Sequence, residues 1–80
     1  MPTVLHADGF RVVIYTRDHR PPHVHVLSSA GLAVITLGGC GTAPGFREVK
    51  GLRDAEAMRA MRLVREHHEA LLQHWERIHG

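Results

Sequence analysis

The first half of the chain alternates apolar and polar residues in short runs, a pattern typical of β-strands. These runs are separated by turn signals such as Asp8-Gly9 and Ser28-Ser29-Ala30-Gly31. The double proline Pro21-Pro22 cannot donate hydrogen bonds within a sheet, so a strand is expected to begin after it. The pattern therefore predicts four strands, over residues 3–7, 10–16, 23–27 and 32–37.

From residue 54 onward the apolar residues recur at steps of three and four, the period of an amphipathic helix. The apolar stripe includes Met58, Met61, Leu71 and Trp75. It predicts either one helix over residues 54–78 or two helices that meet near His67-His68. Strands followed by helix indicate an α+β fold. We expect a small, mostly antiparallel sheet of three to four strands, with one long or two short C-terminal helices packed on one face.

Eighty residues are enough for one hydrophobic core, so we interpret residues 1–80 as a single domain. Little chain remains to cover the second face of the sheet, which predicts a homodimer or a partner protein. Neither a membrane span nor a signal peptide is predicted, because the apolar runs are short and the N-terminus has no basic region. The single cysteine, Cys40, cannot form an intramolecular disulfide and is interpreted as incidental. These features favour the cytoplasm.

Charge and histidine content raise the question of chemistry. Ten Lys and Arg against eight Asp and Glu give a formal net charge of +2, too small by itself to indicate nucleic-acid binding. Histidine is the unusual component, with eight in 80 residues. Imidazole is both an acid–base catalyst near neutral pH and the commonest protein ligand for metals. The positions of the histidines in the chain must therefore show whether they have a chemical role or only reflect an unusual composition.

The segment over residues 17–26 concentrates these histidines. On a strand, His23 and His25 project from the same face, while Val24 and Val26 project from the other. Five of the remaining histidines are interpreted as incidental or structural, among them His68, which is expected to be a core histidine with a satisfied nitrogen. The members of this group are His6, His67, His68, His74 and His79.

Three interpretations of the pair stay open. In the first, His23 and His25 are the acid and base of a metal-free phosphodiester cleavage, and Arg17 or Arg11 stabilises the charge on the phosphate. In the second, His19 joins them to bind a divalent metal such as Zn or Ni. In the third, the two imidazoles are structural and bridge the proline turn to the end of the helix near Trp75.

The chain resembles a family of small bacterial proteins known as domain of unknown function 4160, over nearly its full length. The resemblance rests on Met1-Pro2-Thr3, on Asp18-His19 with Pro21-Pro22-His23-Val24-His25-Val26, and on Leu71-Leu72-Gln73-His74-Trp75 with Ile78. The family usually has an aromatic residue between the two histidines, where this chain has Val24.

The resemblance implies a compact α+β fold and a cytoplasmic bacterial setting. It also implies a small operon-encoded partner of a second family, domain of unknown function 2442, in pairs that look like toxin–antitoxin modules. From the residues and the resemblance together we hypothesise a component of such a pair that acts on or binds RNA through the His-x-His strand face. The alternative is a non-enzymatic metal-binding or protein-interaction module.

Overall fold

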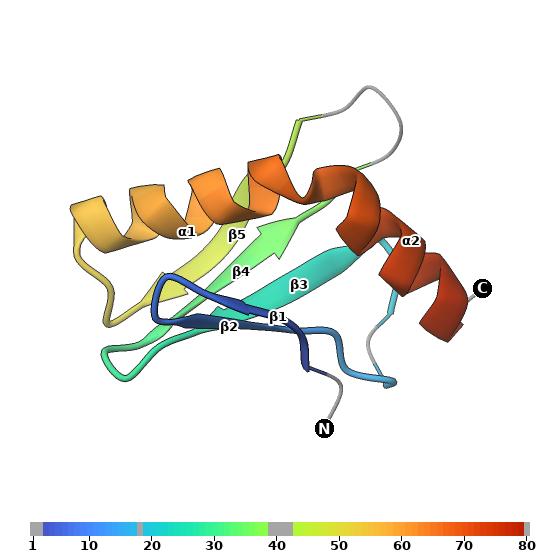
Figure 1. Cartoon of the computed structure of the whole chain (residues 1–80), viewed down its shortest axis with the longest axis horizontal. Helices are drawn as coiled ribbons and strands as arrows, with labels where there is room; N and C mark the ends of the chain where they lie inside the picture. Colours follow the sequence, from blue (N-terminus) through green and yellow to red (C-terminus); the bar gives the residue numbers. More distant parts are fainter. Residues whose placement is uncertain (1–2, 18, 39–42, 80) are drawn as a thin grey trace.

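The computed structural model describes residues 3–17, 19–38 and 43–79, and its strands form one antiparallel sheet (Figure 1). The strands follow one another in the order β1-β2-β3-β4-β5, so each pairs with its neighbours in sequence. Their bounds are Thr3–Ala7 for β1, Phe10–Val13 for β2, His23–Leu27 for β3, Leu32–Thr36 for β4 and Gly45–Lys50 for β5.

The sheet has five strands, whereas three to four were expected, and the strand that was not predicted is β5. The alternating pattern fails to reveal this strand because its pairing with β4 shifts register between Val34 and Ile35. Glu48 pairs with Val34 and Phe46 pairs with Ile35, so Arg47 is an extra residue between two ladder positions. A bulge of this kind interrupts the period of two that identifies a strand in sequence. The second strand is also shorter than predicted and ends at Val13.

Two helices follow the sheet, which confirms the two-helix form of the prediction. α1 spans Asp54–Glu66 and α2 spans His68–His79. At the junction, Nδ1 of His67 lies 3.0 Å from the Leu63 carbonyl oxygen. The next residue, His68, makes a hydrogen bond from Nε2 to the Leu37 carbonyl at the end of β4. His68 is therefore a packed histidine that ties the start of α2 to the sheet.

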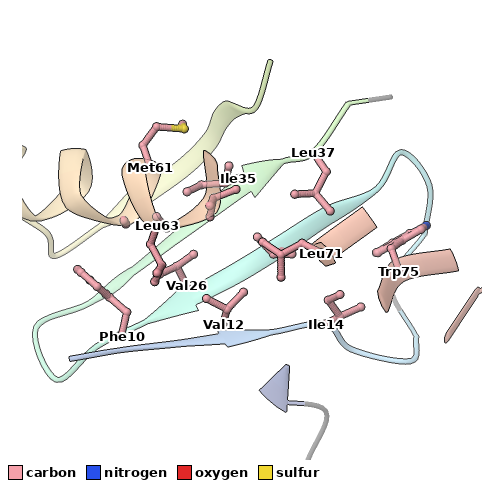
Figure 2. Packing of buried hydrophobic residues seen from close by; sticks show 14 residues of the cluster. Phe10, Val12, Ile14, Val26, Ile35, Leu37, Met61, Leu63, Leu71 and Trp75 are labelled. Atoms are coloured by element: carbon pink, nitrogen blue, oxygen red, sulfur yellow. The ribbon is translucent and has the colours of Figure 1, made fainter. Parts of the chain in front are cut away.

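Both helices lie on the same side of the sheet, with α1 over β4 and β5 (Figure 1). Figure 2 shows strand side chains directed toward helix side chains in one core. Alternation places Val24 and Val26 in that core, together with Phe10, Val12 and Ile14. The fully buried helix residues include Trp75 and Val64. No helix in the described part of the chain is long and apolar enough to cross a membrane.

The turn between β3 and β4 packs closely against the turn between β5 and α1. Gly51 has a φ of +77°, and a Cβ built there would lie 2.5 Å from the Ala30 carbonyl oxygen. Gly9, in the β1–β2 turn, has nearly the same φ of +78°, but a Cβ there would have nothing within 4 Å. The two glycines therefore share a backbone requirement and differ in the space around them.

We expect Gly51→Ala to lower the free energy of unfolding more than Gly9→Ala. Both alanines incur the left-handed backbone cost of about 1–2 kcal/mol. Only Gly51→Ala adds a clash, for which overpacking costs of about 1–3 kcal/mol are typical. Urea denaturation of the two variants and the parent chain measures the difference. Equal destabilisation would show that the β5–α1 turn can move away from the β3–β4 turn and so avoid the clash.

Candidate functional site

His23 and His25 lie side by side and project from the side of β3 opposite Val24 and Val26, while the His23 ring, at the start of the strand, also approaches α2. Their ring centroids are 5.5 Å apart, with an interplanar angle of 60°. The intervening Val24 points into the core, as the period of two in a strand requires. The strand thus brings together two titratable rings at one end of β3, directly after the double proline.

The His23 ring is held in place on two sides. It is buried, with 6% of its surface exposed, and its Nδ1 lies 2.9 Å from the Pro21 carbonyl oxygen. Because a carbonyl only accepts hydrogen bonds, Nδ1 carries the proton. The ring centroid lies 5.3 Å from that of Trp75 in α2. His23 therefore joins the proline turn to α2, which is the contact that the structural interpretation expected of it.

His25 is more accessible than His23. Its ring is half-buried and meets the edge of the Tyr15 ring, with centroids 4.8 Å apart and an interplanar angle of 77°. A hollow of about 250 Å³ opens beside it. The residues that line this histidine hollow are His23, His25, Val34, Arg47 and Glu48.

The hollow pairs the two imidazoles with side chains of both charges. Val34 pairs with His25 across β3 and β4, and Glu48 pairs with Val34 across β4 and β5. The Glu48 carboxylate also lies 3.6 Å from the Lys50 ammonium. Arg47 is the extra residue at the bulge, and it is one of the residues that line the hollow. A guanidinium beside two imidazoles is suited to a phosphate ester.

The other predicted site residues lie elsewhere. Arg11 shares the face of the histidines but lines a separate hollow, together with His6 and Ser29. Arg17 is exposed and is not among the residues of the histidine hollow. The arginine that accompanies the histidines is thus Arg47, in place of the predicted Arg11 and Arg17. Asp18 and Cys40 lie outside the described residues.

His19 is exposed in the loop before the double proline. The described residues contain no group of three or more His, Cys, Asp or Glu side chains that could hold a metal ion. His19, His23 and His25 all belong to the described part of the chain, so the loop does not bring His19 into such a group with the strand pair. The histidines that the structure brings together are therefore two.

Sequence reasoning missed Arg47, Glu48 and Tyr15. The first two escaped because the bulge concealed β5, the strand that lies across β4 from the histidines. Tyr15 escaped because it lies beyond the end of β2, and only the structure shows that Val13 pairs with His25. His79 was expected to be incidental, but its ring stacks on Trp75 with centroids 3.8 Å apart.

The protein is a small α+β domain in which two helices cover one face of a five-stranded antiparallel sheet. Its candidate site is the pair of histidine rings on β3. The chain belongs to the family described as domain of unknown function (DUF4160), whose model matches residues 9–76. That range includes β2 to β5, the histidine pair and Trp75. Comparisons with curated proteins and with solved structures found no match.

The two histidines should differ in their effect on stability. We expect His23→Ala to lower the free energy of unfolding by about 2–3 kcal/mol, because it removes a buried ring and a hydrogen bond to the Pro21 carbonyl. His25→Ala should cost about 1 kcal/mol or less, because the ring is only half-buried. Urea denaturation measures both values. A larger loss for His25→Ala would contradict the assignment of His23 as the packing residue.

Proposed function

We propose that this protein is a metal-independent RNA-cleaving component of a toxin–antitoxin-like pair. One observation supports this proposal most strongly: two histidines and an arginine line the same hollow. Cleavage of RNA at its own 2′-hydroxyl needs a base, an acid and a group that stabilises charge on phosphate. These three functions match the side chains of His23, His25 and Arg47.

The tautomer of His23 suggests its role. When the ring is neutral, the proton on Nδ1 is directed to the Pro21 carbonyl, so the lone pair resides on Nε2. In this tautomer Nε2 is the basic nitrogen of the ring, and we assign His23 the role of base on that ground. His25, which is more accessible, would then donate a proton as the imidazolium.

The proposed step conserves atoms and charge without a cofactor. The 2′-oxygen of the ribose forms a bond to phosphorus as its proton passes to His23. The bond from phosphorus to the 5′-oxygen breaks as His25 gives that oxygen a proton. The products are a 2′,3′-cyclic phosphate and a 5′-hydroxyl. Arg47 would bind the non-bridging oxygens, where negative charge increases in the transition state.

Neighbouring residues would support these roles. The Tyr15 ring, which follows β2 and makes a T-shaped contact with His25, would help to orient it. Arg11 lies farther along the same face and would bind the phosphate that follows or precedes the one cleaved. Local clustering of this kind permits RNA binding in spite of the small formal net charge of +2.

The main test is cleavage of a single-stranded RNA by the purified chain and by His25→Ala. We expect the variant to lose about 10²- to 10⁴-fold in cleavage rate, the contribution typical of general acid–base groups. Arg47→Gln should lose activity as well, whereas Arg77→Gln, on the exposed face of α2, should retain it. His25 is preferred to His23 as the tested histidine because its replacement leaves the buried contacts of Trp75 unchanged.

Two outcomes would overturn the catalytic proposal. One is equal cleavage by the parent chain and His25→Ala. The other is a product with a 5′-phosphate, because the proposed step leaves the phosphate on the 3′ side. Expression in bacteria adds a cellular measurement: growth arrest should occur with the parent chain and be relieved in His25→Ala. Co-expression of an operon-encoded partner of the domain of unknown function 2442 type should relieve it in the parent.

The metal-binding alternative predicts different behaviour. If the proposal is right, cleavage continues in EDTA, and untagged protein retains less than about 0.1 equivalent of Zn or Ni, because a pair of imidazoles lacks the three or four ligands of a typical zinc site. Elemental analysis checks this, with His19→Ala/His23→Ala/His25→Ala as the control. Stoichiometric metal that disappears in the triple variant would favour the metal-binding module.

A further inference from the structure

The exposed apolar side chains of the fold gather along one edge, where β5 runs beneath α1. Three large hydrophobic residues of the described chain are exposed: Phe46 at 44%, Val49 at 41% and Met58 at 65%. Phe46 and Val49 pair with Ile35 and Ala33, so they occupy the helix side of β5. Met58 belongs to the adjoining helix α1. Together they form an apolar edge that the fold leaves in contact with water.

A hollow accompanies this apolar edge. It measures about 360 Å³, and its lining includes Phe46 from β5 and Met58 and Met61 from α1. Arg62 and Arg65 form the rest of the α1 side. β5 is the last strand in the sheet order, so in the described part of the chain no strand pairs with its outer side. An edge strand beside an apolar hollow is the arrangement that accepts an added strand.

The other edge of the sheet lacks these features. In β1, the apolar residues Val4, Leu5 and Ala7 pack against the hydrophobic core. None of them is among the exposed large hydrophobic residues of the described chain. The two edge strands thus differ in the apolar surface that they offer, which favours β5 as the docking edge.

Charge identifies the occupant. The β5–α1 edge carries Arg47, Lys50, Arg62 and Arg65, and Glu48 is the acidic residue of β5. In a partner strand that alternates apolar and acidic residues, the apolar side chains would contact Phe46 and Met58 on the helix side. The carboxylates would project to the other side, near Arg47 and Lys50 of β5.

We propose that the edge formed by β5 and α1 is a docking site for an extended acidic segment of a partner protein, which adds to the sheet as a sixth strand next to β5. Main-chain hydrogen bonds of such an addition supply affinity, and the alternate side chains supply specificity. The docking site is independent of the RNA chemistry proposed above, because binding requires only the edge. Arg47 belongs to both surfaces, so a docked segment would also restrict access to the histidine hollow.

The test uses a synthetic eight-residue peptide that alternates Glu with Val or Phe, and a matched peptide with Lys in place of Glu. Titration into isotope-labelled protein should shift the amide resonances of residues 45–50. The Lys peptide should bind at least about tenfold more weakly, because like charges oppose it. Binding of the Glu peptide should weaken as salt rises from about 50 to about 500 mM, because salt screens exposed charges.

Variants separate the apolar and charged contributions. Phe46→Ser should weaken binding of the Glu peptide by at least about tenfold, as loss of a central aromatic anchor does in interfaces. Arg47→Glu/Lys50→Glu should do the same, because these cations lie on the side of β5 to which the carboxylates of the peptide project. The control Arg17→Glu/Arg77→Glu changes the net charge equally at exposed positions away from the edge, and should leave binding within about twofold, since rim charges far from a contact contribute little.

Four results would overturn the proposal. The first is no binding of the Glu peptide, and the second is equal binding of the two peptides. The third is shifts confined to β1 or to the β3 residues His23 and His25. The fourth is protection of the β5 amides that depends on the concentration of the protein alone, which would assign the edge to a second copy. A single-stranded RNA that shifts residues 45–50 when the Glu peptide does not would assign it to nucleic acid.

Discussion

The imidazole of His23 lies where three parts of the chain meet, and its fixed position determines much of the rest. Nδ1 donates to the Pro21 carbonyl, and the ring packs near the indole of Trp75. Trp75 is fully buried and is itself stacked by His79. The start of β3, the proline turn and α2 are thereby placed relative to one another. The proposed chemistry of the neighbouring His25 depends on this placement, because the 5.5 Å separation of the two rings follows from it.

The two faces of the sheet have different composition for a simple reason. Alternation along β2, β3 and β4 sends one set of side chains to the helices, where they are buried. The other set includes Arg11, which is exposed, His25, which is half-buried, and His23, whose ring is buried near Trp75. Chemistry and stability are therefore largely separated by face. His23 is the exception, since it contributes to both.

Much of the site was accessible from sequence because its spacing follows backbone geometry. A spacing of two residues on a strand places His23 and His25 on one face in any regular sheet. The arginine that joins them was not accessible, and Arg11 and Arg17 were chosen because they are near in sequence. Arg47 reaches the hollow across β4, through a pairing more than 20 residues from His25 in sequence that a bulge conceals. Residues distant along the chain become neighbours only through the register of the sheet.

The sequence alone determined the α+β class, the change from strand to helix near residue 54 and the shared face of the histidine pair, and it offered a helix break near His67-His68 as one of two alternatives. Each of these depends on local periods of two or of three to four residues, which a linear chain expresses directly. Only the tertiary structure showed that a fifth strand completes the sheet and that Arg47 and Glu48 line the hollow of the histidine pair. It also showed that His19 does not join the pair in a group that could hold a metal, and that Phe46 and Met58 are exposed. These depend on which segments pack together, and packing is set by burial across the whole core rather than by any local pattern.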